Sequence, residues 1–548
     1  MTRIYDRYLR QRISRRRLLQ ATGASALGAA GVAIAGCGSG SPAGTATPSS
    51  EGTPQPGGIV HLRQSLTYPN FNPFGPGISA LIPGLFVGFA LYDHLWYVPT
   101  DTGEVIPFLA DEIETIDAQT IRVTMKDAVF QDKPPVNGRA VRSTDLKASI
   151  EKFKEQVPFG FSWLQEVLER VETPDDRTIV YHQNRPWAWF FTASNAGSPW
   201  TSSIIPEEVL DQQDILDNDP IGSGKWMLAG HDGGTNVKLR KFQNWREPGL
   251  PLLDGVDYIF ASDDTLAQAA FSAKDIDRIT GLNFIERDEM VNRFGDELRI
   301  DSDLSRRYRT LMLKNEPPFD NPQVVHGINL ALDREEIKQV LNLGDGELCG
   351  PLPPAHERFV LDENDPDLQE YFRYDPADAK LMLEGAAFPF DQEFVLKYWA
   401  LDQSPDLVQV IASQLQEVGI KITLPGAEDL TAWLSNTLGP GNFQMTAFTH
   451  LPYEDPSLPL SFYKSPNFMD YENPDVEAAF LAAAAEVDEE ARIELTKEAQ
   501  RVIIRNWGPM LNLYSPKSFG ATWDYYKGLV LSRGSFGAFN SRAWLDKS

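Results

Sequence analysis

The stretch SPDLVQVIASQLQEVGIKITL, residues 404–424, reads as a helix followed at once by a strand. The apolar residues that share one helical face are Leu407, Val408, Ile411, Leu415 and Val418. Ser404-Pro405 is typical of a helix start and Gly419 of a helix end. A second apolar run, 394–396, ends just before Tyr398-Trp399, ahead of this helix. Strand, helix and strand in this order predict a parallel pair covered by the helix, and therefore an α/β fold.

Other segments carry the same two kinds of signal. Residues 121–125 and 237–240 alternate apolar and polar side chains, and 311–313 is a short apolar run, so all three are predicted strands. Further helix starts, each a capping residue followed by Pro, are Asn321-Pro322, Asp375-Pro376 and Asn473-Pro474. No repeat of fixed short period is present, which argues against a solenoid or propeller.

Length and charge narrow the class of protein. The chain has 548 residues and 61.2 kDa, enough for two or three domains, and 42% of its residues are hydrophobic. The net charge is −27; residues 1–36 hold seven Arg and one Asp, so the remainder carries −33. An acidic body of this kind repels phosphate backbones, and we expect no nucleic-acid partner.

The N-terminal residues are predicted to direct export. Residues 14–20 are basic and 21–36 are rich in Ala and Gly, so 1–36 is a predicted signal peptide. Its paired arginines resemble a twin-arginine (Tat) signal, although Leu18 stands where that pattern usually has Phe. Residues 34–37, Ile-Ala-Gly-Cys, resemble a lipobox, which implies a lipid on Cys37; an incidental Cys after a plain signal peptide is the alternative.

Residues 37–57 are then a lipidated Cys and a flexible linker, because 15 of the 19 residues in 38–56 are Gly, Ser, Thr or Pro. We expect a periplasmic or cell-surface protein, anchored to the outer face of the cell membrane.

Eight segments in collinear order resemble extracellular solute-binding proteins of family 5, the oligopeptide- and dipeptide-type receptors of ABC importers. The segments begin near Gly57 and end near residue 515. They are 57–62, 71–73, 91–110, 130–146, 220–226, 271–277, 315–334 and 374–377, with a long helix expected after Pro474.

The resemblance implies a two-lobed, periplasmic-binding-protein-like fold of type II with three subdomains, whose hinge-linked lobes close over a solute. Lobe I would comprise 58–310 plus 516–548, with an extra subdomain at about 81–220, and lobe II 311–515. A monomer would deliver its solute, an oligopeptide or oligosaccharide, to an ABC permease with cytoplasmic ATPases. Closure needs only a ligand that binds the closed form more tightly than the open one.

No motif for bond chemistry is recognisable, so we expect no catalytic residue, cofactor or metal. Gly222-Ser223-Gly224-Lys225 lacks the remaining Walker residues, so we expect a turn that enters a strand. The acidic run 362–367 has Pro366 at a ligand position of a Ca²⁺ loop, so we expect a solvated loop. The seven His show no zinc-binding spacing, and Cys349 has no activating neighbour in sequence. An extracytoplasmic hydrolase or a ligand-sensing surface protein on the same scaffold is the alternative.

The region 443–456 bears on the solute. In peptide-binding relatives, the matching strand end carries an Asp that pairs with the α-ammonium of the peptide; here that position is Pro452. A buried ammonium without a carboxylate is costly. Either Glu454 or Asp455 replaces the Asp, or the solute is not a free-amine peptide, which is the interpretation we favour.

The candidate ligand-binding residues lie at predicted strand ends, where aromatic faces can stack on sugar rings or apolar groups. Each aromatic residue could equally belong to the core. The candidates are Asn70, Phe71, Asn72, Tyr398, Trp399, Trp433, His450, Tyr453, Glu454 and Asp455.

Overall fold

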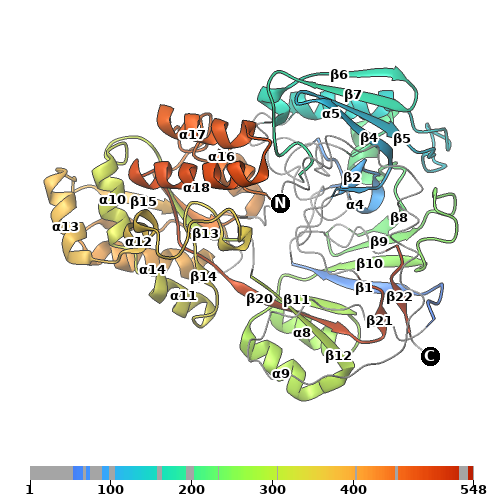
Figure 1. Ribbon diagram of the computed structural model, residues 1–548. Helices are drawn as coiled ribbons and strands as arrows, with labels where there is room; N and C mark the ends of the chain where they lie inside the picture. The colour runs from blue at the N-terminus through green and yellow to red at the C-terminus, as the bar shows by residue number, and fades with distance from the viewer. Residues whose placement is uncertain are drawn as a thin grey trace, which may run out of the picture.

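The computed structural model describes residues 53–65, 70–74, 89–97, 105–156, 163–192, 203–232, 234–304, 307–400, 404–450, 455–529 and 541–546. Two large bodies of sheet and helix lie side by side (Figure 1). Among the described residues, no helix is long and apolar enough to cross a bilayer.

A seven-stranded sheet forms the base of the first body (Figure 1). Its strands, in order across the sheet, are β12 (Leu298–Leu304), β20 (Lys517–Trp523), β11 (Arg278–Leu282), β1 (Ile59–Gln64), β10 (Gly255–Phe260), β9 (Asn236–Lys241) and β8 (Trp226–His231). β1 is parallel to β10 and β11, and the other neighbours are antiparallel. Helices α8 (Asp264–Ser272) and α9 (Phe284–Phe294) pack beside it around Phe271 and Trp523, whose rings stack 5.0 Å apart.

A second, four-stranded antiparallel sheet lies above the first in Figure 1. Its strands are β4 (Ala110–Asp117), β5 (Thr120–Met125), β7 (Thr178–Gln183) and β6 (Leu168–Asp175). Small elements that join it to the seven-stranded sheet are α4 (Phe89–Leu91), β2 (Trp96–Tyr97), β3 (Ile106–Pro107), η3 (Trp163–Val167), η4 (Glu207–Val209) and α7 (Gln213–Asn218). Helix α5 (Ser143–Gln156) contacts β6, β7 and η4.

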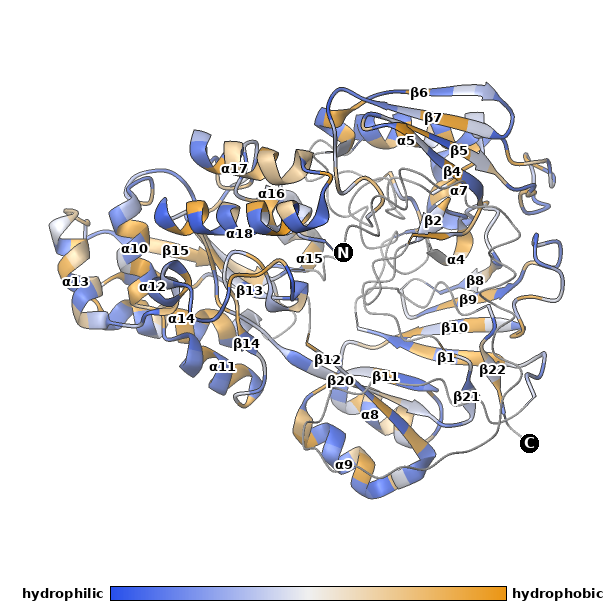
Figure 2. Ribbon diagram, in the orientation of Figure 1, coloured by the Kyte–Doolittle hydropathy of each residue, from blue (hydrophilic) through white to orange (hydrophobic). Residues whose placement is uncertain are grey.

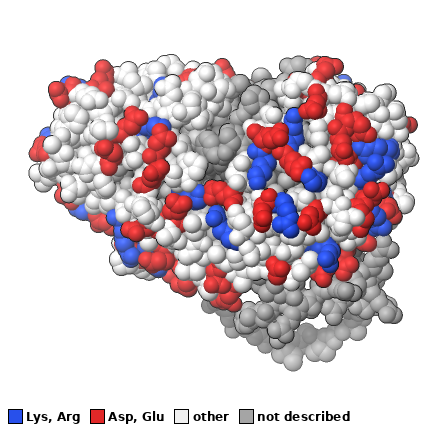
Figure 3. All heavy atoms as spheres, turned by 90° about the horizontal axis from the view of Figure 1, so that it is seen from above, with Lys and Arg blue, Asp and Glu red and all other residues white. Residues whose placement is uncertain are grey.

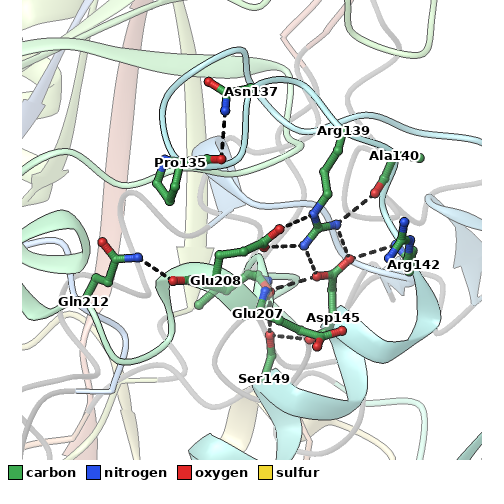
Figure 4. A network of polar contacts seen from close by, with 11 residues as sticks. Pro135, Asn137, Arg139, Ala140, Arg142, Asp145, Ser149, Glu207, Glu208 and Gln212 are labelled. Atoms are coloured by element: carbon green, nitrogen blue, oxygen red, sulfur yellow. Dashed lines mark hydrogen bonds and ion pairs between the residues drawn. The ribbon is translucent and has the colours of Figure 1, made fainter.

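Arg139 holds this four-stranded unit together (Figure 4). Its guanidinium donates to both oxygens of Asp145, at 2.6 and 2.9 Å, and to Oε1 of Glu208 at 2.6 Å. The Asp145 carboxylate, which is fully buried, also accepts the backbone N–H of Arg142 and of Glu207. The Asp145 and Glu208 carboxylates therefore join the 130–142 loop to the start of α5 and to η4, and a structural role accounts for the sequence segment 130–146.

The second body contains a five-stranded sheet. Its strands, in order, are β16 (Lys421–Thr423), β15 (Glu393–Lys397), β17 (Met445–Thr449), β13 (Arg309–Leu313) and β18 (Met510–Asn512). β15 and β16 are parallel and are joined through α14 (Ser404–Glu417), which confirms the predicted strand–helix–strand unit. The helix ends before Gly419, whose φ is +97°.

Helices and a short strand pair surround this sheet. The helices that cover it are α10 (Pro322–Leu330), α11 (Arg334–Asn342), α12 (Pro366–Phe372), α13 (Pro376–Gly385), α15 (Leu430–Ala432), η7 (Trp433–Leu438), α16 (Ser457–Ser461), α17 (Pro474–Ala485) and α18 (Glu489–Arg505). In Figure 2 the ribbons of α11 and α18 alternate between hydrophilic and hydrophobic residues, as expected of helices with one face on a core. The strand pair on this side is β14 (Glu347–Leu348) with β19 (Tyr514–Ser515). Two further pairs belong to the first body: β2 with β3, and β21 (Tyr526–Lys527) with β22 (Trp544–Leu545), which lies near β1 in Figure 1.

The chain passes between the two bodies twice, from β12 to β13 and from β19 back to β20. The second passage returns residues 517–523 to the first sheet, between the edge strand β12 and β11. The molecule is therefore a two-lobed α/β protein in which the chain enters the second body and then returns to the first.

The structure explains the glycines at 222 and 224 and revises the interpretation of the acidic run 362–367. Gly222 and Gly224 lie against the backbone of Leu91: a Cβ on Gly222 would stand 2.0 Å from the Leu91 carbonyl oxygen. The glycines serve close packing before β8, in agreement with a turn that enters a strand. In contrast, the acidic run 362–367 is not only a solvated loop, because Asp365 caps α12 and Pro366 is its first residue.

Charges of both signs are interspersed on the face in Figure 3, which looks down on the molecule from the top of Figure 1. Ion pairs of the four-stranded unit include Arg139–Glu208 and Lys152–Asp211, at 2.5 and 2.7 Å.

Candidate functional site

The two faces of β17 separate two environments. Met445 and Ala447 point into a mainly aliphatic cluster that includes Ile411 of α14, with a few rings such as Phe394; we call this side of the sheet the aliphatic face. Phe448 points the opposite way, into a second cluster that continues without a break into residues of the first body. Because side chains alternate along a strand, Thr446 and His450 share the Phe448 side. The Phe448 face of β17 is therefore the part of this sheet that is continuous with the other lobe.

Aromatic rings gather on the Phe448 face. The Trp433 ring lies 4.7 Å from that of Phe448 and 5.3 Å from that of Trp399. His450 lies 4.6 Å from Phe448 and stacks on Tyr308 at 4.3 Å with an interplanar angle of 15°. We call Tyr308, Trp399, Trp433, Phe448 and His450 the aromatic cluster.

Polar bonds orient the indole rings of the aromatic cluster. Trp433 Nε1 donates to Thr446 Oγ1 at 3.3 Å, and Trp399 Nε1 donates to Ser404 Oγ at the start of α14. Trp399 also forms a bridge to Glu428 just beyond β15. Each tryptophan is thus fixed by one edge to a strand or helix end, while its faces meet other rings.

His450 is uncharged near neutral pH. Burial lowers the pKa of His450 to about 3, because the imidazolium would lose its hydration. Its backbone N–H donates to the Tyr308 carbonyl at 2.8 Å, which fixes the segment that leaves β17. The aromatic cluster is consequently neutral and suits an uncharged or apolar group of a solute rather than an anion.

Asp455 adds a carboxylate near this strand end in sequence. Its Oδ1 accepts the Ser457 N–H at 2.8 Å and the Ser457 hydroxyl. Its Oδ2 is buried and has no hydrogen-bond partner among the residues that the structure describes. Asp455 is 4% exposed, so that oxygen is a desolvated acceptor that a donor could still engage.

Residues 104–470 match the model of the bacterial extracellular solute-binding proteins, family 5. This match spans more than half of the chain. The chain belongs to this family. The resemblance found in the sequence is thereby confirmed, and with it the extracellular class and a solute-binding rather than an enzymatic family.

Known relatives agree with the fold. The glutathione-binding protein GsiB of Salmonella typhi is 22% identical over 428 residues, which cover 72% of this chain and 78% of that protein. The oligopeptide-binding protein AppA of Bacillus subtilis, solved with a nonapeptide, has a TM-score of 0.76 at 20% identity, covering 90% of this chain and all of that one. AgaA of A. tumefaciens R10, solved with agropinic acid, has a TM-score of 0.75 at 21% identity, covering 90% of this chain and 99% of that one. The predicted two-lobed α/β fold is confirmed.

The predicted residues of this solute-binding protein divide into three groups. Trp399, Trp433 and His450 meet in the aromatic cluster, with Asp455 following the same strand in sequence. Tyr398 does not join them, because it is half-buried against the aliphatic face. The residues that lie outside the described parts of the chain are Cys37, Pro452, Tyr453 and Glu454.

The third group follows β1 and has local contacts. Asn70 Oδ1 accepts the Asn72 N–H at 3.0 Å, and Asn72 Oδ1 accepts the Phe74 N–H at 2.8 Å. Phe71 is buried with its ring 5.1 Å from His231 of β8. These contacts stabilise a turn that packs against β8 and α7, so Phe71 and Asn72 have a structural role within the first lobe.

Tyr308 and Phe448 are members of the aromatic cluster that the sequence interpretation missed. Phe448 could have been found, because Thr446, Phe448 and His450 alternate with Met445 and Ala447 along one predicted strand. Tyr308 is 142 residues before His450 in the chain, and only the antiparallel pairing of β13 with β17 brings them together.

Buried ionisable side chains also lie elsewhere in each lobe. In the first lobe, the Arg246 guanidinium lies 2.5 Å from Asp93 and over the rings of Phe108 and Trp245. Burial raises the pKa of Asp93 and lowers that of Lys225 to about 7. In the second lobe, Cys349 is fully buried and burial raises its thiol pKa, which fits an inert thiol.

Proposed function

We propose that this protein is the extracytoplasmic solute-binding subunit of an ABC importer, which captures an organic solute, an oligopeptide or an oligosaccharide, and delivers it to a permease. The observation that carries the proposal is the neutral aromatic cluster on the side of β17 that is continuous with the other lobe. Aromatic faces provide contact area for apolar side chains or sugar rings, and fixed edges such as Trp433 Nε1 keep that area rigid.

The lobes that close would be 58–310 with 516–548, and 311–515. The place of β20 between β11 and β12 supports the return of the chain to the first lobe. A solute that binds the closed form more tightly than the open form would shift the equilibrium toward closure, and the permease would read that closed shape.

We further propose that the solute lacks a free α-ammonium group or pairs it with Asp455. Pro452 brings no carboxylate to the position that binds the amine in peptide-binding relatives. Among the described carboxylates, Asp455 is the nearest in sequence to Pro452. Its Oδ2 is buried and has no hydrogen-bond partner among the described residues. A free-amine peptide and its N-acetylated form distinguish these two possibilities directly.

A thermal-shift screen tests the function. The panel holds di- to pentapeptides, the same peptides N-acetylated, and cello- and xylo-oligosaccharides. A solute at one hundred times its Kd should stabilise the protein by about 2.7 kcal/mol and raise Tm clearly. If no solute of any class raises Tm while a partner protein binds, transport is the wrong function.

The variant Phe448→Leu tests the place of binding. We expect the solute Kd to rise by about tenfold or more, since the aromatic contact is lost, while unfolding free energy falls by less than about 1.5 kcal/mol. Phe394→Leu is the matched control, because Phe394 is equally buried on the aliphatic side of the same sheet. Equal effects of both variants on Kd would contradict a site on the Phe448 face.

The lipid anchor is a separate proposal, carried by the lipobox-like residues 34–37. Cys37→Ala should release the protein from the membrane fraction, whereas Cys349→Ala should leave it there, because Cys349 is a buried thiol. Fractionation and mass spectrometry of the N-terminal peptide measure the result. A Cys37→Ala protein that stays in the membrane fraction would point to another attachment.

A further inference from the structure

In the described part of the chain, η3 and the residues that follow β7 contact helices of the second lobe. Lys464, which follows α16, donates from Nζ to Glu166 Oε1 of η3 at 2.8 Å. The Lys464 side chain is only 4% exposed. A lysine so deeply buried requires a partner, and its carboxylate comes from the other lobe.

Aromatic packing surrounds this ion pair. Trp187 and Trp189 lie 6.0 and 6.1 Å from Phe480 of α17, and 6.0 Å from each other. All three rings are at most 3% exposed. Between the tryptophans, the Ala188 N–H donates to the Ala484 carbonyl in the last turn of α17 at 2.7 Å. Three rings, an ion pair and a main-chain hydrogen bond are thus buried by contact between the lobes.

The same four-stranded unit is joined to the seven-stranded sheet in a different way. Gly224 N–H donates to the Leu91 carbonyl at 2.9 Å, and Gln131 N–H donates to the Gly222 carbonyl at 2.9 Å. At Gly222 and Gly224 the backbones touch without room for a Cβ. Backbone packing of this kind leaves no freedom to slide. When the lobes part, the unit must therefore stay with the seven-stranded sheet, and the contacts with α16 and α17 must break.

We propose that Glu166–Lys464, Trp187, Trp189 and Phe480, with the Ala188–Ala484 hydrogen bond, form a latch that holds the lobes closed in the absence of solute. The proposal goes beyond the function given above, because it concerns the ligand-free protein. The latch stabilises the closed form whether or not solute is present. It raises the closed fraction and so the apparent affinity, and the time for which the latch is open limits solute entry.

The Ala188 amide reports the latch directly. Its hydrogen exchange, measured by mass spectrometry on ligand-free protein, is slow while the bond to Ala484 persists. We expect Phe480→Ala to speed exchange in the peptide containing Ala188 by on the order of tenfold or more, with exchange in β5 unchanged. Phe271→Ala, which removes a buried ring from the α8–β20 core, is the matched control and should leave Ala188 protected.

A double-mutant cycle separates the latch from loss of packing. Lys464→Met and Glu166→Gln should each speed Ala188 exchange; Glu166→Gln also removes the 3.4 Å ion pair of Glu166 with Arg185. The double variant should speed exchange no more than Glu166→Gln alone, because both single variants remove the Glu166–Lys464 ion pair. X-ray scattering of the same ligand-free variants should show a larger radius of gyration than wild type. The latch is refuted if the Ala188 amide of ligand-free wild type exchanges like an unstructured amide, or if the effects of the two single variants simply add.

Discussion

The two faces of β17 carry different chemistry although they belong to the same five residues. On one side, Met445 and Ala447 meet the aliphatic side chains of α14. On the other, Phe448 meets indole and imidazole rings with polar edges, and His450 in turn stacks on the phenol ring of Tyr308. Both faces are buried, so burial alone does not distinguish them. The aliphatic face fixes the fold, whereas the aromatic face provides rigid, neutral and partly polar surface toward the other lobe.

The largest effect is expected on the aliphatic face. Ile411 is fully buried between α14 and the sheet, and Ile411→Ala should lower the free energy of unfolding by about 2–5 kcal/mol through lost burial and a cavity. Urea unfolding of the ligand-free protein measures this change. The Kd for the best solute of the screen should stay within about twofold, because the site lies on the opposite face of the sheet.

The control for Ile411→Ala is Leu381→Ala on α13, which is 67% exposed and should change stability by less than about 0.5 kcal/mol. A large loss of affinity in Ile411→Ala would show that the two faces are coupled, and the separation drawn between them would be wrong.

Of the two faces of β17, the aromatic one carries a titratable ring, His450, and should give a pH effect. The folded-state pKa of His450 is about 3, below its ordinary value of 6.5, so between these values the unfolded chain binds a proton that the folded protein does not. Stability should therefore be complete above about pH 6.5 and fall as the pH drops toward 3, by up to about 1.4 kcal/mol per pH unit. Unfolding curves at several pH values between 4 and 7 measure this slope.

His450→Phe should reduce that slope, since a phenyl ring keeps the stacking on Tyr308 and cannot bind a proton. Part of the slope should persist in the variant, because burial also lowers the pKa of His326. An unchanged slope would show that water reaches His450 in the folded protein, contrary to a dry aromatic cluster.

The aliphatic half of this comparison could be predicted from the sequence. The helical periodicity of 404–418 and the Gly419 stop located α14 and its parallel strands, since period and caps are local properties. Three capping residues followed by Pro likewise marked α10, α13 and α17. The same signal at Asp365-Pro366 was overlooked, because the surrounding acidic residues suggested only a solvated loop.

The aromatic half could be predicted only in part. Trp399, Trp433 and His450 were recognised as candidates, but the sequence does not say which distant segments meet. Tyr308 joins His450 through the pairing of β13 with β17, a contact between strands far apart in the chain. The latch is equally non-local, since Glu166 and Lys464 are 298 residues apart and neither belongs to a motif.

The smallest effect is expected from replacing a single hydroxyl that orients a ring of the aromatic cluster. Thr446→Val removes the acceptor of the Trp433 indole and the donor to the Lys397 carbonyl, which lies at 3.0 Å. The free energy of unfolding should fall by about 1 kcal/mol.

Thr310→Val is the matched control, because Thr310 is as buried as Thr446 and donates to the Leu511 carbonyl at 3.2 Å without holding a ring. Both variants should lose similar stability by urea unfolding. Titration calorimetry should show weaker solute binding only for Thr446→Val, because only that hydroxyl orients Trp433. Equal affinities would mean that the orientation of the indole has no part in recognition.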